Sequence, residues 1–501
     1  MLSTTGLDGR GRTLARLGLV LGAVALLAGC TDTTSSRQRI GSLVECTLPR
    51  IAQSARCGEI EVPENRDKPD GRKIRIAFAV LAANTLDAAP DPLVLLAGGP
   101  GQAASYLGPL ALQLNAVRRY RDIVLVDQRG TGRSAPLKCA AFVPADTPEL
   151  ALEIDPVPRA TQCAKELADQ GVDAAQYTTA NWILDLEAVR AALGYPQLNL
   201  WGGSYGTRAA QEYARRFPQH VRTMVLDGVA TPALKVPLDV WPTRQAAIAA
   251  AFDACLKSAA CKAGHTDLKT AIGAIDERLS GGRDIALTDP RTGEVRTMHV
   301  TLDHVIAAFQ ALVYLPEFAA LLPEATRLAT TGDLGPLYAA ASAMTSGISE
   351  QLDSALYYSV TCTEDVPRIT PEERQAKLDK VYARTIAERG IAVCDAWPHG
   401  KAAPESSTPL VSDIPTLLLS GGLDPVTPPA YADEVAKTLR NSRHVIAAGY
   451  GHNVSPHACA PRLIAQFIED AGFANLPESC IRYFEHSTPP PAWPDRLAPR
   501  P

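Results

Sequence analysis

The stretch Leu198-Asn199-Leu200-Trp201-Gly202-Gly203-Ser204-Tyr205-Gly206-Thr207 decides the fold. Its apolar run ends in glycines and is followed by the helical pattern of residues 209–217, which predicts a strand, a sharp turn and a helix. Such a turn, the nucleophile elbow, exposes a serine hydroxyl at the start of the helix, where free amides and the helix dipole favour a developing anion. We therefore expect Ser204 to be a catalytic nucleophile. The alternative is a glycine-rich turn that holds an incidental serine.

Apolar runs on both sides of this stretch indicate a doubly wound, mostly parallel sheet. Strand patterns lie at residues 74–81, 92–96, 123–126, 198–201 and 223–226, and helical patterns lie between them. Strands that alternate with helices are typical of an α/β fold. The alternation stops near residue 235 and resumes with strand patterns at 414–419 and 444–446. Between them the sequence is rich in alanine and has helical periodicity, so we expect an inserted helical cap there.

Two residues near the carboxyl end supply the groups that a serine nucleophile needs. Asp424 follows one strand pattern in a Gly-Gly-Leu-Asp-Pro turn, and His452 follows the next in a Gly-Tyr-Gly-His turn. The order serine, acid, histidine along the chain is that of the α/β-hydrolase fold. We expect His452 to take the proton of Ser204, and Asp424 to hold the imidazole in the required tautomer.

Other residues could fill these two roles. Asp227 is the second candidate for the acid, and His444 and His457 are the nearest competitors of His452. Asp424 could instead be a turn residue before proline, and His452 a structural loop histidine. Neither competing histidine follows a strand through a glycine-rich turn, so the first assignment is preferred.

Acyl transfer also requires amides that point at the oxyanion. The turn Ala97-Gly98-Gly99-Pro100-Gly101 follows an early strand, where this fold places one of them. We expect the amide of Gly98, or that of its neighbour Gly99, to act together with the amide of Tyr205. The alternative is a plain Gly-Pro turn.

Three motifs carry a resemblance to a known family. Gly-Gly-Pro-Gly at 98–101, Asp-Gln-Arg-Gly-Thr-Gly-Arg-Ser at 127–134 and Trp-Gly-Gly-Ser-Tyr-Gly-Thr at 201–207 resemble those of the prolyl-iminopeptidase-related hydrolases. The secreted tripeptidyl aminopeptidases of that group are more similar still, with a carboxyl-terminal segment that matches 414–480. The resemblance covers most of residues 46–480. One departure is Ala97, where family members often have histidine.

The resemblance implies a serine peptidase that releases amino-terminal residues or short peptides through an acyl-enzyme, without a metal or other cofactor. A carboxylate under the cap must then hold the substrate ammonium, because an unpaired buried ammonium is costly. Glu364 or Asp365, near the return of the cap to the core, could supply it. The alternative is that both are solvated surface acids. Arg129 and Arg133 are expected to brace their loop through carbonyls and carboxylates.

Two other functions remain open at this point. The same three residues would serve a carboxylesterase that acts on small esters, and a catalytically inactive hydrolase scaffold could bind peptides. Apolar residues make up 46% and charged residues 21% of the 501 residues, and the net charge is −5, which fits a globular enzyme and gives no sign of a nucleic-acid partner. The number of residues removed and the oligomeric state cannot be deduced from the sequence.

The first thirty residues are expected to be a lipoprotein signal peptide. Arg10, Arg12 and Arg16 precede the apolar stretch 17–27, and Leu-Ala-Gly-Cys at 27–30 resembles the lipobox, in which the cysteine is lipidated. We expect Cys30 to anchor the chain to the membrane of the cell envelope, at the outer membrane or periplasmic face in a Gram-negative cell. An ordinary signal peptide is the alternative.

Cysteine usage also fits export. Apart from Cys30 there are ten cysteines, an even number suited to an oxidising compartment, and none has the spacing of a zinc site. Neighbours in sequence are expected to pair, although free buried thiols are the alternative: Cys46 with Cys57, Cys139 with Cys163, Cys255 with Cys261, Cys362 with Cys394, and Cys459 with Cys480.

The expected organisation follows from these features. It consists of a signal peptide (1–30), a flexible tether (31–45), the first part of the hydrolase core (46–235), the helical cap (236–405), the second part of the core (406–485) and a proline-rich tail (486–501).

Overall fold

The computed structural model describes residues 43–142, 154–349 and 351–492. The expected signal peptide, the lipidated Cys30 and nearly all of the tether lie outside these ranges, as does the end of the tail from residue 493. In the ranges that are described, no helix combines the length and the hydrophobicity of a membrane span.

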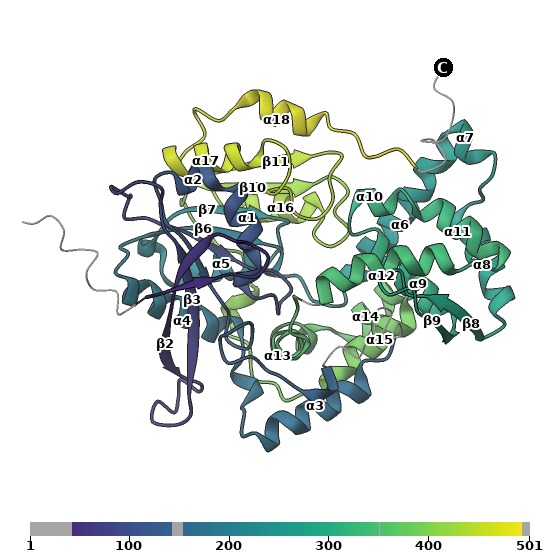
Figure 1. Ribbon diagram of the computed structural model, residues 1–501, viewed down its shortest axis with the longest axis horizontal. Helices are drawn as coiled ribbons and strands as arrows, with labels where there is room; N and C mark the ends of the chain where they lie inside the picture. Colours follow the sequence, from purple (N-terminus) through teal and green to yellow (C-terminus); the bar gives the residue numbers. More distant parts are fainter. Residues whose placement is uncertain (1–42, 143–153, 350, 493–501) are drawn as a thin grey trace, which may run out of the picture. The chain divides into compact units, whose positions relative to one another are not determined.

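A nine-stranded sheet forms the centre of the fold, in the order β1-β2-β3-β5-β4-β6-β7-β10-β11 (Figure 1). Three strands at one edge pair in antiparallel fashion: β1 (Val44–Thr47), β2 (Ser54–Pro63) and β3 (Lys73–Leu81). The remaining strands are parallel to one another: β5 (Ile123–Val126), β4 (Leu93–Leu96), β6 (Leu198–Gly203), β7 (Val221–Asp227), β10 (Thr416–Gly421) and β11 (Ser442–Ala447). Every residue of β4 and β5 is apolar and buried, as in parallel strands that are covered on both faces. The expected α/β fold with a mostly parallel sheet is confirmed.

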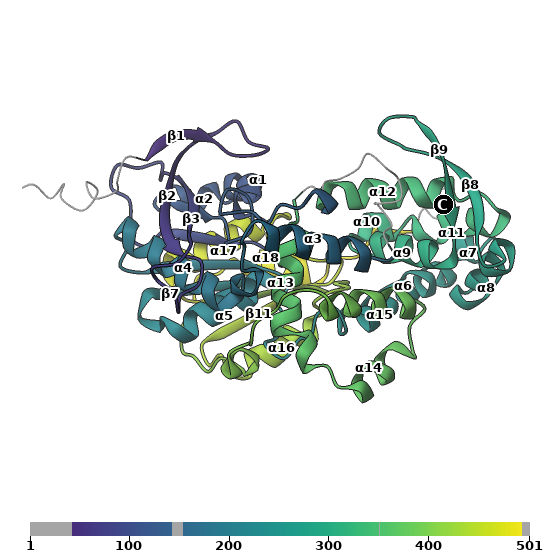
Figure 2. The same cartoon turned by 90° about the horizontal axis from the view of Figure 1, so that it is seen from below.

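Helices from distant parts of the sequence cover the sheet (Figures 1 and 2). One apolar cluster joins the strands to four helices: α1 (Gly108–Gln113), α2 (Asn115–Arg118), α17 (Ala460–Asp470) and α18 (Glu478–Glu485). Outside this cluster, α4 (Thr179–Leu193) and α5 (Tyr205–Arg216) pack against each other, and α5 packs on β6. Local sequence fixes the ends of α4, because the side chain of Thr178 accepts a hydrogen bond from Asn181 N, and Gly194 adopts the left-handed conformation at the other end.

The cap lies between β7 and β10 in the sequence. Its larger helices are α6 (Val240–Lys257), α8 (Leu268–Leu279), α9 (Leu302–Leu312), α11 (Leu322–Thr331), α12 (Gly335–Ser349), α13 (Ser354–Glu364), α14 (Pro371–Leu378) and α15 (Arg384–Ala392). Residues of α6, α8, α9, α11 and α12 share an apolar cluster of their own, separate from that of the sheet. A further helix, α3 (Val157–Asp169), comes from the segment between β5 and β6 and contacts α15.

The cap also contains a hairpin that the helical expectation missed. β8 (Arg283–Thr288) and β9 (Val295–Val300) pair in antiparallel fashion. In β9 only Met298 and Val300 are buried, two residues apart, so one face of the strand packs on the cap and the other is exposed to solvent. This alternation was a sequence feature that could have revealed the strand.

Residues 302–319 of the cap do not form one continuous helix. α9 ends at Leu312, and the four-residue α10 (Pro316–Ala319) begins after an extended Leu315. Proline disfavours the helical conformation of the residue before it, which explains the break. The break places Tyr314 beside the ring of His452, as described below.

Five disulfides join residues that are near in sequence. The pairs are Cys46–Cys57, Cys139–Cys163, Cys255–Cys261, Cys362–Cys394 and Cys459–Cys480. Two of them lie in the sheet and its helices: the first links β1 to β2, and the last links the start of α17 to α18. These cross-links stabilise the fold mainly by restricting the unfolded chain.

Candidate active site

Ser204 occupies the sharp turn between β6 and α5. Its φ is 56° and its ψ is −122°, a conformation that costs a residue with a side chain roughly 1–3 kcal/mol. The turn needs glycines on both sides: a Cβ on Gly206 would lie 2.1 Å from the carbonyl oxygen of Leu96, and one on Gly202 would lie 2.4 Å from that of Gly206. The strain is held by neighbouring backbone, because Ser204 N donates to the carbonyl of Asp227 at 2.9 Å.

His452 and Asp424 form a buried pair. Nδ1 of His452 lies 2.8 Å from Oδ2 of Asp424, and their side chains are 1% and 0% exposed. Since the carboxylate fixes the proton on Nδ1, the other ring nitrogen, Nε2, is available as a base. Nε2 is buried and has no hydrogen-bond partner among the residues that the structure describes. This arrangement leaves it free to accept the proton of a nucleophile.

The carboxylate of Asp424 is held on three sides. Oδ1 accepts hydrogen bonds from the amides of Val426 and Thr427, each at 2.8 Å, and Oδ2 accepts one from the hydroxyl of Thr427 at 2.8 Å. These donors fix the orientation of the carboxylate towards the imidazole.

Asp227, the second candidate for the catalytic acid, has a structural role. Asp227 is fully buried, and its carboxylate accepts hydrogen bonds from Val454 N at 2.8 and 3.0 Å and from Ser455 N at 2.7 Å. Burial raises the pKa of the Asp227 carboxyl. Because its carboxylate binds these two amides, Asp227 supports the loop that follows His452.

The competing histidines lie elsewhere. His444 Nδ1 is 2.9 Å from Asp433 Oδ1 and its Nε2 is 2.9 Å from Ser420 Oγ. The ring of His457 packs against the ring of Tyr450, with centroids 5.2 Å apart. Both rings therefore have structural partners other than Asp424.

The turn at Gly98 lies directly against the serine. A Cβ on Gly98 would be 3.2 Å from the Cβ of Ser204, so the backbone of the two turns is in close contact. The Gly98 amide donates to Oε1 of Gln102 at 3.3 Å, which a substrate oxyanion would have to replace. Tyr205 is the first residue of α5, where backbone amides have no partner within the helix. The amides of Gly98 and Tyr205 thus flank the nucleophile.

A cavity of about 500 Å³ opens at Ser204, between the core and the cap. The core contributes Gly99, Pro100, Ser204 and Tyr205, and the cap contributes Trp241, Arg244, Gln310, Tyr314 and Tyr357. The ring of Tyr314 meets the ring of His452 edge-on, with centroids 5.1 Å apart. Burial raises the pKa of Tyr314 to about 12, so its hydroxyl stays protonated at neutral pH.

The two acidic residues proposed for the substrate ammonium differ in their placement. Asp365 lines the cavity, and both of its oxygens accept from Arg208 Nη1 at 3.0 and 3.1 Å, while Arg368 donates to Oδ1 at 2.8 Å. Glu364 lies outside the cavity lining and accepts from the amide and hydroxyl of Thr179 at 2.6 and 2.7 Å. Both are buried, so neither is a solvated surface acid.

Thr179 connects Glu364 to the nucleophile elbow. Its hydroxyl lies 2.7 Å from the hydroxyl of Tyr205, which also accepts from Gln128 Nε2 at 3.2 Å. Burial raises the pKa of Glu364 to about 7. The chain from Glu364 to Tyr205 fixes the side chain next to the nucleophile, a role that no sequence pattern revealed.

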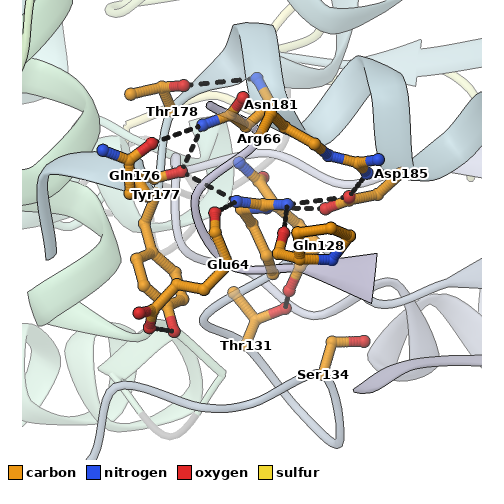
Figure 3. Close-up of polar contacts among 12 residues, drawn as sticks. Glu64, Arg66, Gln128, Thr131, Ser134, Gln176, Tyr177, Thr178, Asn181 and Asp185 are labelled. Carbon is orange, nitrogen blue, oxygen red and sulfur yellow. Dashed lines mark hydrogen bonds and ion pairs between the residues drawn. The ribbon is translucent and has the colours of Figure 1, made fainter. Parts of the chain in front are cut away.

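Arg129 braces the loop between β5 and α3. It is completely buried, and its Nε and Nη2 donate to Asp185 at 2.6 and 2.8 Å, while Nη1 donates to the carbonyls of Glu64 and Gln176 at 2.8 and 3.0 Å. Glu64, Gln176 and Asp185 are labelled in Figure 3. Arg133, by contrast, is exposed, and its backbone amide donates to Asp127 at 3.1 Å.

One group of potential metal ligands is already occupied by other partners. In the described part of the chain, one group of three potential metal ligands lies close together, namely Cys255, Cys261 and His265. The two sulfurs of this group are bonded to each other, and His265 Nε2 lies 3.0 Å from Glu324, so the usual ligand atoms already have partners.

A serine in a strained elbow, a buried Asp–His pair and a parallel sheet define a serine hydrolase of the α/β-hydrolase fold. Two family models match the chain: residues 91–252 match the alpha/beta hydrolase fold, and residues 379–480 match a TAP-like protein. Between them these segments contain Ser204, Asp424 and His452.

Curated relatives agree with this class. Serine protease Hip1 of Mycobacterium tuberculosis is 27% identical, over 86% of this chain and 91% of its own. Tripeptidyl aminopeptidase of Streptomyces coelicolor is 27% identical, over 89% of this chain and 85% of its own. Carboxylesterase B of M. tuberculosis is 31% identical over 50% of this chain and 54% of its own. The chain is thus similar to the TAP-like α/β hydrolases in two segments and to curated peptidases over most of its length.

Among solved structures, proline iminopeptidase from Mycobacterium smegmatis covers 83% of this chain and 98% of its own, at 15% identity and a TM-score of 0.42.

Proposed function

We propose that the enzyme releases amino-terminal residues or short peptides through an acyl-enzyme on Ser204. The observation that carries this proposal is the cavity at Ser204, which the cap closes on one side and which is lined by Tyr314 and Thr427, two residues that contact His452. A peptide end fits such a cavity between core and cap, whereas the middle of a long chain would have to pass through the cap. The two curated relatives with full-length similarity carry peptidase names, which supports the same conclusion.

The chemical steps follow from the geometry. Nε2 of His452 takes the proton of the Ser204 hydroxyl as its oxygen attacks the scissile carbonyl, and Asp424 stabilises the resulting imidazolium. The amides of Tyr205 and of Gly98, or of its neighbour Gly99, donate to the oxyanion of the tetrahedral intermediate. His452 then protonates the leaving amine. Water, activated by the same nitrogen, attacks the ester carbonyl and returns Ser204 to its hydroxyl form.

We assign the substrate ammonium to Asp365 rather than to Glu364. Among the cavity residues that the structure describes, Asp365 is the acidic one, and Glu364 lies behind it. Arg208 and Arg368 share the charge of Asp365, so its attraction for an ammonium is weaker than that of a free carboxylate.

The amine assignment is tested with matched peptides. Asp365→Asn should raise KM for a free-amine tripeptidyl anilide by about tenfold and leave KM for its acetylated counterpart nearly unchanged, since a charge-assisted hydrogen bond is worth about 1.5–3 kcal/mol. An equal effect on both substrates would remove Asp365 from amine binding.

A carboxylesterase is the second candidate, because carboxylesterase B matches half of the chain and the same catalytic residues would hydrolyse an ester. A short-chain aryl ester that is cleaved far faster than any free-amine peptide would favour this candidate. A catalytically inactive peptide-binding protein is a third. If a fluorophosphonate labels the wild-type enzyme covalently and does not label Ser204→Ala, the inactive peptide-binding protein is excluded.

We further propose that Cys30 carries a lipid that attaches the enzyme to the cell envelope, as the lipobox-like sequence suggests. Metabolic labelling with an alkyne fatty acid should modify the wild-type chain and not Cys30→Ala. Labelling that persists in the variant would contradict the assignment.

A further inference from the structure

One cation in the cavity at Ser204 forms no ion pair with the residues that the structure describes. The charged residues among those that line it are Arg208, Arg244 and Asp365. Arg208 is paired with Asp365, which in turn also binds Arg368. Arg244 forms no hydrogen bond or ion pair with any residue that the structure describes, and its Nε is buried without a partner.

The buried arginines that the structure describes are paired: Arg129 binds Asp185, Arg121 binds Asp91 and Arg208 binds Asp365. Arg244 is partly buried, but its Nε–H is removed from water without an acceptor, which is costly and requires an explanation. The nearest aromatic contact of Arg244 is the ring of Trp241, 5.8 Å from its guanidinium carbon, which orients the group and leaves its donors unused.

Other polar atoms of the same cavity also lack partners. Nε1 of Trp241 is buried and makes no hydrogen bond to the described residues, and the same holds for Nε of Arg208 and for both Nε2 and Oε1 of Gln310. Trp241 and Arg244 lie one turn apart on α6, and Gln310 lies on the neighbouring helix α9. Arg244, Trp241 and Gln310 therefore line one cavity and each have an unsatisfied N–H group, and a carboxylate accepts hydrogen bonds from such donors.

We propose that Arg244, with Trp241 and Gln310, binds a carboxylate of the substrate. This inference rests on the proposed function and names the substrate class: peptides that carry a negative charge near the scissile bond. The carboxylate could belong to an acidic side chain or to the free carboxyl terminus of a short peptide. The planar guanidinium can bind either in a bidentate manner. Asp365 and Arg244 then give the cavity one group for each end of a zwitterionic peptide.

The experiment compares kcat/KM for matched peptides in wild type and Arg244→Met. In the first comparison both peptides have an amidated carboxyl terminus, and one contains Glu where the other contains Gln; each position of the peptide is tested in turn. In the second comparison the two peptides have the same sequence, and only one of them has a free carboxyl terminus. In wild type one pair should show a preference of about tenfold or more for the charged member, and the pair that does so identifies the source of the carboxylate. In Arg244→Met that ratio should fall to about one. A wild-type ratio near one in both pairs, or a ratio that Arg244→Met leaves unchanged, would overturn the proposal.

The test uses the ratio of kcat/KM for the charged and the neutral peptide, because a general loss of active enzyme changes both values equally. Arg283→Met, which changes an exposed arginine of the cap hairpin, is the matched control and should keep the wild-type ratio. Arg244→Lys keeps the charge and loses the fork, so its ratio should lie between those of wild type and Arg244→Met. If Arg244→Met does not fold, Arg244→Lys and Trp241→Phe carry the test, and wild-type ratios in both would overturn the proposal.

A separate arm distinguishes this inference from the proposed function. Glutarate should inhibit hydrolysis of a neutral aryl ester competitively in wild type, with an inhibition constant at least tenfold weaker in Arg244→Met. If no peptide is cleaved and this inhibition is present, the peptidase proposal fails and the carboxylate site stands. If peptides are cleaved and glutarate does not inhibit, the carboxylate site fails alone.

Discussion

The carbonyl oxygen of Asp227 accepts a hydrogen bond from the amide of Ser204 at 2.9 Å. The carboxylate of the same residue accepts hydrogen bonds from the amides of Val454 and Ser455, which come just after His452 in the sequence. One residue at the end of β7 thus holds the nucleophile through its backbone and the loop of the base through its side chain.

Asp227→Asn should therefore reduce kcat by about ten- to a hundredfold with little change in KM. The amide can accept only one set of these hydrogen bonds, and misplacement of a catalytic group by an ångström has costs of this size. Steady-state kinetics on a tripeptidyl anilide, together with the melting temperature, provides the measurement. A variant with wild-type kcat, or one in which kcat falls only in proportion to the folded fraction, would contradict this positioning role.

Asp424→Asn should reduce kcat by about 10⁴-fold, because an amide in place of the carboxylate stabilises the wrong tautomer of His452 and cannot stabilise its cation. Thr427 should still hold the side chain in place, so the fold is expected to persist. The same substitution at Asp433, the exposed partner of His444, is the control and should leave kcat within about twofold. Comparable losses in the two variants would argue against the Asp424 assignment.

Gly206→Ala should abolish activity and destabilise the fold, because its Cβ would lie 2.1 Å from the carbonyl oxygen of Leu96. Gly273→Ala is the matched control: it lies in helix α8, and a Cβ there meets nothing within 4 Å. The control should gain up to about 1 kcal/mol from helix propensity. Urea unfolding of the two variants measures their stability relative to wild type. A fully active Gly206→Ala would contradict the close packing of the elbow.

Glu364 should make the protein less stable as the pH rises. Burial raises the pKa of its carboxyl to about 7 in the folded chain, above the value of about 4.3 expected for the unfolded chain. The folded state thus favours the protonated form, and its contribution is complete below about pH 4 and declines until the pH passes about 7.

Glu364→Gln removes this titration, so the free energy of unfolding of the variant, relative to wild type, should increase by about 3 kcal/mol between pH 4 and pH 8. Asp353, whose pKa burial also raises to about 7, is present in both proteins and cancels in the difference. Denaturant unfolding with intact disulfides at the two pH values is the measurement. Parallel pH profiles for the two proteins would show that Glu364 does not titrate in this way.

The fold and the class of enzyme could be predicted because they depend on local patterns. The elbow at Ser204 requires glycines at fixed spacing, and parallel strands are short apolar runs that alternate with helices. The positions of Asp424 and His452 after consecutive strands follow from the same rule, since parallel strands end at one edge of the sheet.

The contents of the cavity could not be predicted in this way. The pairing of Asp365 with Arg208 joins residues 157 positions apart, and nothing in either local sequence indicates it. The same holds for Arg244, whose importance lies in the lack of a partner within the folded chain. The cap hairpin was missed because only two residues of β9 carry its alternation.

The most direct test of the central claim is the rate at which wild type and Ser204→Ala cleave a free-amine tripeptidyl anilide and its acetylated counterpart. Our account predicts rapid cleavage of the free-amine substrate by wild type, slower cleavage of the acetylated one, and no cleavage by Ser204→Ala. Cleavage that persists in Ser204→Ala would contradict the account.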